Sequence, residues 1–328
     1  MPQKPRFVRT SLAVKIFLCV LAGTYMVYLV GLSHNLFPAL WTPSTTIIEH
    51  PVDTSASTVE HYWTTSSMQG AISADQQMST TPTLTQESSD ISAGKAAQQQ
   101  GQPPQIADAS TYPLSSTVGK LFMTNAAGQN MVCSGTAVIS ANQSVVDTAG
   151  HCLYWNGGWV HNVIFCPLYD SGNSQYGCWA ARDLEAPADW VDATPNDYHH
   201  DMGMAIVSPN SEGLLTEVVG GAGWAYNQPT NQSYSAYGYP AAYPFDGQTK
   251  QSCENGTGQS WKHGGGTVIS IPCNMTGGSS GGPWFVQING KWYLDGHNDF
   301  ISGLRPNNMY SPVYDDTWYA MYEKAQDA

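Results

Sequence analysis

The feature that most constrains the fold is a series of short β-type runs between Tyr112 and the C-terminus. Each run is rich in β-branched, aromatic or other apolar residues, and Gly, Asn or Pro stands in nearly every gap between runs. The clearest runs are TVGKLFMTN, MVCSGTAVIS, QSVVDT, WVHNVIFC, MGMAIV, SYSAYGY, GTVISIPC, GPWFVQI and KWYLDGH. Short strands at this spacing favour an antiparallel sandwich or barrel, so we expect an all-β fold.

A helical pattern is clear only at the C-terminus, in DDTWYAMYEKAQDA. Asp315 or Asp316 is a suitable N-cap, and Trp318, Met321 and Tyr322 share one face of a helix with 3.6 residues per turn. The sequence therefore predicts a β-rich domain over residues 112–328 that ends in one helix.

The N-terminal part of the chain has a different composition. Basic residues precede an apolar stretch that ends at Leu32, which is the arrangement of an export signal. Residues 1–32 are predicted to be a cleaved signal peptide or a retained signal anchor, and either would place the rest of the chain outside the cell. Residues 33–111 are rich in Ser, Thr, Gln and Pro and poor in apolar residues, which predicts a disordered linker or a pro-segment.

Six of the seven cysteines follow residue 130 and suggest three disulfides in an oxidising compartment. They are Cys133, Cys152, Cys166, Cys178, Cys253 and Cys273. A strand hairpin would bring Cys133 and Cys152 together, so we expect this pair, while the connectivity of the other four stays open. No CxxC pair or HExxH motif is present, and no metal site is predicted.

The charge of the chain excludes one class of partner. The formal net charge is −13, and only 11% of the residues are charged. Nucleic-acid binding requires a basic face, so a nucleic-acid partner is not expected. A membrane contact is expected only through residues 1–32, if they are retained.

Three short motifs carry candidate catalytic residues. In TGGSSGGP, glycines surround Ser280, which allows a tight turn with an exposed hydroxyl beside backbone N–H groups that can hold an oxyanion. A serine hydroxyl needs a base, and the best candidate is His151 in TAGHC, next to Cys152. Asp201 in HDMGMAIV directly precedes an apolar strand and can orient the imidazole, with Asp197 as its local rival.

These motifs, in the order His, Asp, Ser, resemble those of the chymotrypsin-like serine peptidases with the trypsin fold, in particular short bacterial members near the glutamyl-endopeptidase branch. The likeness spans about residues 115–325. It implies two antiparallel β-barrels with the site between them, protein or peptide substrates, and no metal or organic cofactor. We expect the protein to be a monomer.

The resemblance also assigns roles to individual residues. Ser280 is expected to be the nucleophile, His151 the general base and Asp201 the residue that orients it, while the N–H groups of Gly278 and Ser280 form the oxyanion hole.

Two positions depart from the family pattern. Ser279 stands where animal members carry an Asp that pairs with a newly cut N-terminus, so an inhibitory pro-segment would have to act sterically. Asp147 stands where an apolar residue is usual, and a carboxylate in a strand there needs a partner.

The stretch YLDGHNDFISG is expected to form a wall of the primary substrate pocket. His297 resembles the position of the His with which glutamyl endopeptidases contact the substrate carboxylate, although a satisfied histidine in a strand is an equal alternative. Asn298 and Asp299 are further candidates, and Asp299 would favour a basic side chain if it points inward.

The sequence thus predicts a secreted or surface-tethered serine endopeptidase that acts through an acyl-enzyme intermediate. The alternative is a catalytically inactive trypsin-fold module that binds or adheres at the cell surface.

Overall fold

The computed structural model describes residues 45–77, 85–86, 105–106, 114–192, 197–263 and 265–328. Residues from Thr45 to Ala328 cluster into one compact unit. The predicted export segment lies outside the described residues. Among the helices of the described part, none is long and apolar enough to cross a membrane.

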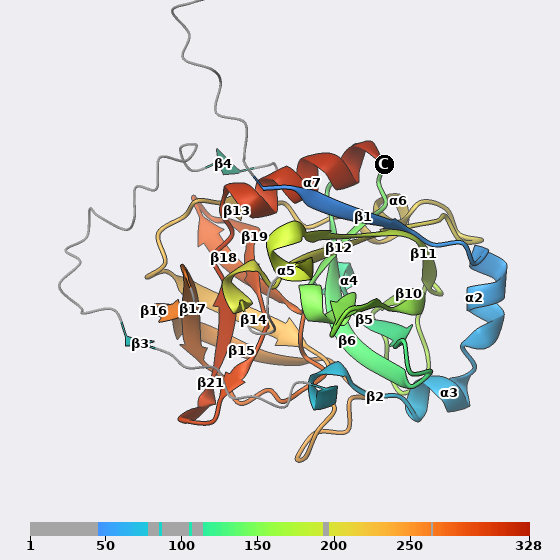
Figure 1. The fold of residues 1–328 in the computed structure, drawn as a ribbon, viewed down its shortest axis with the longest axis horizontal. Helices are drawn as coiled ribbons and strands as arrows, with labels where there is room; N and C mark the ends of the chain where they lie inside the picture. The colour runs from blue at the N-terminus through green and yellow to red at the C-terminus, as the bar shows by residue number, and fades with distance from the viewer. Residues whose placement is uncertain (1–44, 78–84, 87–104, 107–113, 193–196, 264) are drawn as a thin grey trace, which may run out of the picture. The chain divides into compact units, whose positions relative to one another are not determined.

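The first half of the fold is a closed six-stranded antiparallel barrel, drawn mainly in green in Figure 1. Its strands are β5 (Val118–Thr124), β6 (Asn130–Val138), β7 (Val145–Thr148), β10 (His161–Pro167), β11 (Trp179–Pro187) and β12 (Gly203–Val207). They pair in the order β5, β6, β7, β12, β11 and β10, and β10 pairs with β5 to close the ring. Alternate residues such as Leu121, Cys133 and Val146 are buried in a common apolar cluster.

The second half consists of two further sheets. One is ordered β15 (Gln251–Thr257), β14 (Ser233–Gly238), β18 (Pro283–Ile288) and β19 (Lys291–His297). The other is ordered β20 (Ile301–Ser302), β21 (Arg305–Pro312), β17 (Gly266–Pro272), β16 (Gln259–His263) and β3 (Thr85–Gln86). The two sheets share an apolar cluster that includes Trp284, Ile271 and Met309. The β-rich fold is confirmed. Of the two expected barrels, the first is a closed barrel, and the second half is a system of two sheets.

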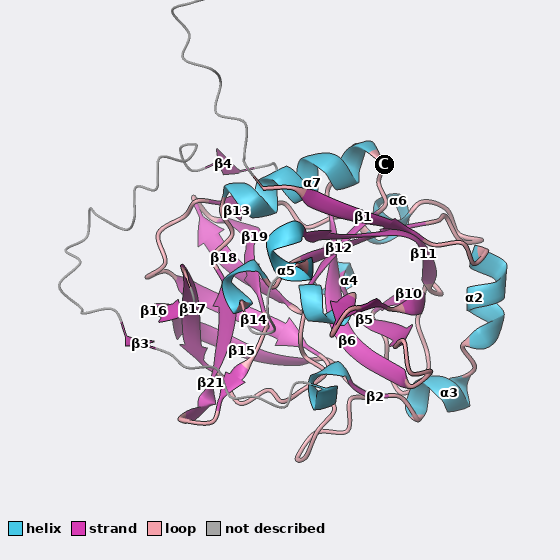
Figure 2. Cartoon of the chain, viewed as in Figure 1, coloured by secondary structure: helices cyan, strands magenta, loops and turns pink. Residues whose placement is uncertain are grey.

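Short elements lie between these strands along the chain, and Figure 2 draws the helices in cyan. They are β8 (Tyr154–Trp155), β9 (Gly158–Trp159), β4 (Gln105–Ile106), β13 (Ala225–Tyr226), α4 (Leu114–Thr117), α5 (Ala188–Val191), α6 (Leu215–Val219) and the single 3-10 turns η2 (Gly150–Cys152) and η3 (Tyr198–His200).

The predicted terminal helix is confirmed as α7 (Asp316–Asp327). Asp315 is its N-cap and accepts a hydrogen bond from the Thr317 N–H. Trp318, Met321 and Tyr322 are all buried on the face that packs against the barrel.

The prediction that residues 33–111 are disordered is wrong for residues 45–77. This segment forms β1 (Ile47–Pro51), α2 (Ala56–Tyr62), α3 (Thr65–Gln69), β2 (Ile72–Ser73) and the 3-10 turn η1 (Ala74–Gln77). β1 adds to β11 in antiparallel register, and β2 adds to β6 in parallel. The few apolar residues of the segment build no core of their own; Val59, Trp63 and Met68 are instead buried against the barrel, so sequence composition did not reveal the order.

Glu185 of β11 gives a testable pH dependence. Its side chain is fully buried opposite Glu49 of β1, and neither carboxyl oxygen has a hydrogen-bond partner. Burial raises the pKa of Glu185 to about 8. The charge of Lys324 opposes this shift, and the charges of Asp183 and Glu49 add to it. The unfolded chain ionises near pH 4.5 while the folded protein keeps the proton up to about pH 8, so stability falls as the pH rises through this window.

We expect Glu185→Gln to raise the midpoint of thermal unfolding at pH 8 by several degrees and to change it little at pH 4, where wild-type Glu185 is protonated in both states. Thermal unfolding followed by circular dichroism at the two pH values measures this difference. The control is Glu212→Gln, on an exposed loop. An equal shift at both pH values would contradict the titration of Glu185.

Candidate active site

His151 and Asp201 meet at one end of the first barrel. His151 lies in η2, directly after β7, and Asp201 follows η3 and leads into β12, the neighbour of β7. Asp201 accepts two hydrogen bonds from His151: Oδ1 from the backbone N–H at 2.7 Å and Oδ2 from the ring Nδ1 at 2.8 Å. Both side chains are buried. This double contact fixes the ring so that Nδ1 carries the proton toward Asp201 and Nε2 is left as the basic atom.

The charges of the pair support each other. Burial alone would lower the pKa of His151, but the charge of Asp201 and its hydrogen bond, with the charge of Asp75, raise it above the ordinary value. Burial alone would raise the pKa of Asp201, and the charge of His151 and the hydrogen bonds from it lower that pKa instead. The arrangement therefore stabilises an imidazolium next to a carboxylate.

A disulfide holds the turn that carries His151. Cys152 is bonded to Cys133 of β6, which confirms the predicted pair. The other two bonds, left open by the sequence, are Cys166–Cys178 and Cys253–Cys273.

Ser280 lies on the loop between β17 and β18, against β6 of the first barrel. The Ser134 N–H donates to the Ser280 carbonyl at 2.7 Å, and the Ser134 hydroxyl donates to the Gly278 carbonyl at 2.9 Å. Gly278 and Gly281 have φ values of 95° and 78°, which other residues rarely adopt. The glycines around Ser280 are thus required by the turn, as the sequence suggested.

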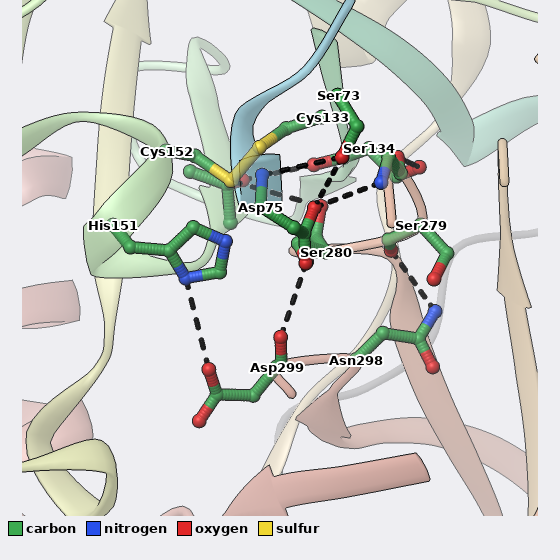
Figure 3. The surroundings of a disulfide bond; sticks show 12 residues. Ser73, Asp75, Cys133, Ser134, His151, Cys152, Ser279, Ser280, Asn298 and Asp299 are labelled. Atoms are coloured by element: carbon green, nitrogen blue, oxygen red, sulfur yellow. Dashed lines mark hydrogen bonds and ion pairs between the residues drawn. A yellow bond between two sulfur atoms is a disulfide. The ribbon is translucent and has the colours of Figure 1, made fainter. Parts of the chain in front are cut away.

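The hydroxyl of Ser280 has partners that the sequence did not predict (Figure 3). Its Oγ donates to Asp75 Oδ1 at 2.8 Å and lies 3.1 Å from the Asp299 carbonyl oxygen. Among the described residues, no hydrogen bond joins Ser280 to His151, and the buried His151 Nε2 has no partner. Asp75 was missed because it lies in a polar stretch without a recognisable motif.

Asp299 lies against the His151–Asp201 pair rather than in an open pocket. Its Oδ1 is 3.7 Å from His151 Nδ1, and the side chain is fully buried. Burial, together with the negative charge of Asp201, raises the pKa of Asp299 well above its usual range, which favours the protonated acid.

His297 and Asn298 are also buried, and their polar atoms are used inside the protein. The two ring nitrogens of His297 bond to the Tyr314 hydroxyl and to the Asp201 carbonyl, both at 2.9 Å. Asn298 donates to the carbonyls of Tyr237 and Ser279 and accepts from Trp284. A substrate carboxylate could contact His297 only by displacing one of these bonds, so the alternative of a satisfied histidine fits the structure.

Asp147 has the hydrogen-bond partners that a carboxylate in a strand needs. Its two carboxylate oxygens accept hydrogen bonds from the Tyr314 hydroxyl at 2.6 Å and the Trp318 Nε1 at 2.7 Å. Because Tyr314 also contacts His297, the strand carboxylate belongs to a buried chain of polar groups that ends at the Asp201 carbonyl.

Three groups of described His, Cys or Asp residues place potential metal ligands within 4.8 Å of one another. The first contains the disulfide Cys133–Cys152, whose sulfurs are no longer thiolates, and the second is the His151, Asp201 and Asp299 cluster. In the third, the Asp197 carboxylate pairs with His199 Nδ1 and with His200 Nδ1, the latter at 3.2 Å. Asp197, the rival candidate, therefore contacts other histidines and not His151.

Comparison with solved structures places this fold among known proteases. The chain is similar to the thermostable serine protease AL20 from an extremophilic microorganism, with 41% identity, a TM-score of 0.60, and coverage of 65% of this chain and 98% of that one. It is also similar to the protease Anisep from Arthrobacter nicotinovorans, with 35% identity, a TM-score of 0.59, and coverage of 69% and 100%. No family profile and no curated protein sequence matches the chain.

The chain therefore belongs to the trypsin-fold serine proteases. A Glu endopeptidase shares the fold at 13% identity, with a TM-score of 0.51 and coverage of 69% of this chain and 97% of that one. At this identity the likeness shows the fold alone.

Proposed function

We propose that this protein is an extracellular serine endopeptidase in which Ser280, His151 and Asp201 form the catalytic triad. The observation that carries the proposal is the buried His151–Asp201 pair, in which Nδ1 is bound by the carboxylate at 2.8 Å and Nε2 is free to accept a proton. The three disulfides fit an oxidising compartment and hence an extracellular location.

The reaction follows from these positions. Ser280 Oγ attacks the carbonyl carbon of the scissile peptide bond, and its proton passes to His151 Nε2. The N–H groups of Gly278 and Ser280 stabilise the resulting oxyanion. When the C–N bond breaks, the leaving amine takes the proton from His151 and an ester to Ser280 remains. A water molecule then gives a proton to His151, attacks the ester and releases the acid, and His151 returns the proton to Ser280.

The alternative of an inactive binding module is favoured by one observation, namely that the Ser280 hydroxyl is bonded to Asp75 and not to His151. A fluorophosphonate probe, which reacts only with an activated serine, separates the two functions. On prolonged incubation of the full chain, we expect wild type and Ser279→Ala to be labelled and Ser280→Ala to remain unlabelled.

Ser279→Ala is the matched control because Ser279 is the adjacent serine and its hydroxyl is bonded to the Thr276 carbonyl. Equal labelling of Ser280→Ala and wild type would rule out Ser280 as the nucleophile.

A further inference from the structure

The Asp75 carboxylate occupies the position that the proposed reaction needs for an oxyanion. Its Oδ2 accepts a hydrogen bond from the Gly278 N–H at 2.8 Å, and its Oδ1 accepts the Ser280 hydroxyl proton at 2.8 Å. One side chain thus binds an expected oxyanion donor and the expected nucleophile together. Figure 3 shows Asp75 joined to Ser280 beside His151 and the Cys133–Cys152 disulfide.

The segment that carries Asp75, residues 45–77, is bound along the first barrel. β1 pairs with β11 over five residues from Ile47 to Pro51, and further along the segment Trp63 Nε1 donates to the Asn162 carbonyl at 2.6 Å. β2 then pairs with β6 at Met131 and Val132, immediately before Cys133. In Figure 1 this segment, drawn in blue, runs from β1 through α2 and α3 to β2. These contacts place Asp75 next to the loop that carries Ser280.

Local contacts hold the carboxylate in place. The Ser73 hydroxyl donates to Asp75 Oδ2 at 2.7 Å and accepts from the Asp75 N–H at 3.2 Å. The turn lies directly on Gly277, where an added Cβ would come within 2.6 Å of Ser73 Oγ and 3.1 Å of Asp75 Cβ. The fit requires a glycine at position 277.

The contact of Asp75 with Ser280 and Gly278 blocks the proton transfer and the oxyanion binding that the proposed reaction requires. The Ser280 proton points to Asp75, and His151 Nε2 is left buried without a partner. The Gly278 N–H already donates its hydrogen bond to the Asp75 carboxylate. The negative charge of this carboxylate repels an oxyanion at the same place. A carboxylate side chain also has no peptide bond that Ser280 could cleave.

We propose that residues 45–77 are an intramolecular inhibitor of this protease and that Asp75 is the inhibitory residue. The inference rests on the proposed function of Ser280. It adds a specific carboxylate to the steric inhibition expected from the sequence. Activation then requires the segment to leave the site, and Ser279 needs no ion pair with a new N-terminus.

The test compares labelling rates of the full chain with a fluorophosphonate. Asp75→Ala removes two charge-assisted hydrogen bonds, each of which contributes on the order of tenfold, so we expect labelling to be about 100-fold faster than in wild type. Asp75→Asn keeps the size of the side chain and one acceptor oxygen, and we expect an intermediate rate. The matched control is Asp53→Ala, an exposed aspartate of the same segment, which leaves the rate unchanged.

A second readout does not depend on turnover. The charge of Asp75 is among the causes that raise the pKa of His151, so Asp75→Ala is expected to lower this pKa in an NMR titration of the imidazole. Circular dichroism of each variant establishes that it is folded.

The possible outcomes separate the two proposals. If Asp75→Ala and wild type are both labelled, and at the same rate, the inhibitory role of Asp75 is overturned and the peptidase function stands. If every folded variant, including Asp75→Ala, resists the probe, both proposals fail. Faster labelling of Asp75→Ala that Ser280→Ala abolishes supports both.

Discussion

Asp201→Asn is expected to lower kcat/KM for a peptide substrate by about four orders of magnitude while leaving the fold intact. The carboxylate accepts both the backbone N–H and the Nδ1 proton of His151. An amide can accept one of these bonds but presents N–H to the other, so the imidazole loses the tautomer and the charge stabilisation that proton transfer requires. The measurement is best made in the Asp75→Ala background, where Ser280 is expected to be accessible.

Asp197→Asn is the matched control for this prediction. Asp197 lies four residues before Asp201 and pairs with His199 and His200, not with His151. We expect its kcat/KM to stay within about tenfold of the parent. A larger loss for Asp197→Asn than for Asp201→Asn would mean that the wrong carboxylate has been assigned to the triad.

The second large effect is on stability. Asp147→Ala removes the acceptor of the Trp318 Nε1 and one of the two partners of the Tyr314 hydroxyl in a fully buried site. Because unsatisfied buried polar groups each cost about 1–3 kcal/mol and a cavity adds to this, we expect a loss of about 3–5 kcal/mol. For a domain of this size that corresponds to a decrease of roughly 10 °C in the midpoint of thermal unfolding.

Thermal unfolding followed by circular dichroism checks this value, with Asp192→Ala as the control. Asp192 is exposed at the end of α5, and its replacement is expected to shift the midpoint by less than about 2 °C. If Asp147→Ala unfolds at the same temperature as wild type, the hydrogen bonds from Tyr314 and Trp318 to Asp147 do not stabilise the fold.

Most strands could be predicted because each carries its own pattern of apolar residues bounded by turn residues. TVGKLFMTN became β5 and KWYLDGH became β19 with boundaries close to those expected. β11 was not predicted, because WAARDLEAP contains Asp183 and Glu185, which are nevertheless buried between strands that lie far apart in the sequence. Burial of these carboxyls depends on the pairing of β11 with β1 and β12, and no local sequence pattern predicts it.

The sequence by itself determined the β-rich fold, the terminal helix, the Cys133–Cys152 bond and the proximity of His151 to Asp201. Each of these depends on a local motif whose chemistry is readable in a few residues, or on the order in which such motifs follow one another. Only the tertiary structure decided that residues 45–77 are ordered, that His297 and Asp299 are buried, and that Asp75 contacts Ser280. The last contact joins residues 205 positions apart, and it exists because paired strands of a closed barrel bring distant backbone segments to one edge.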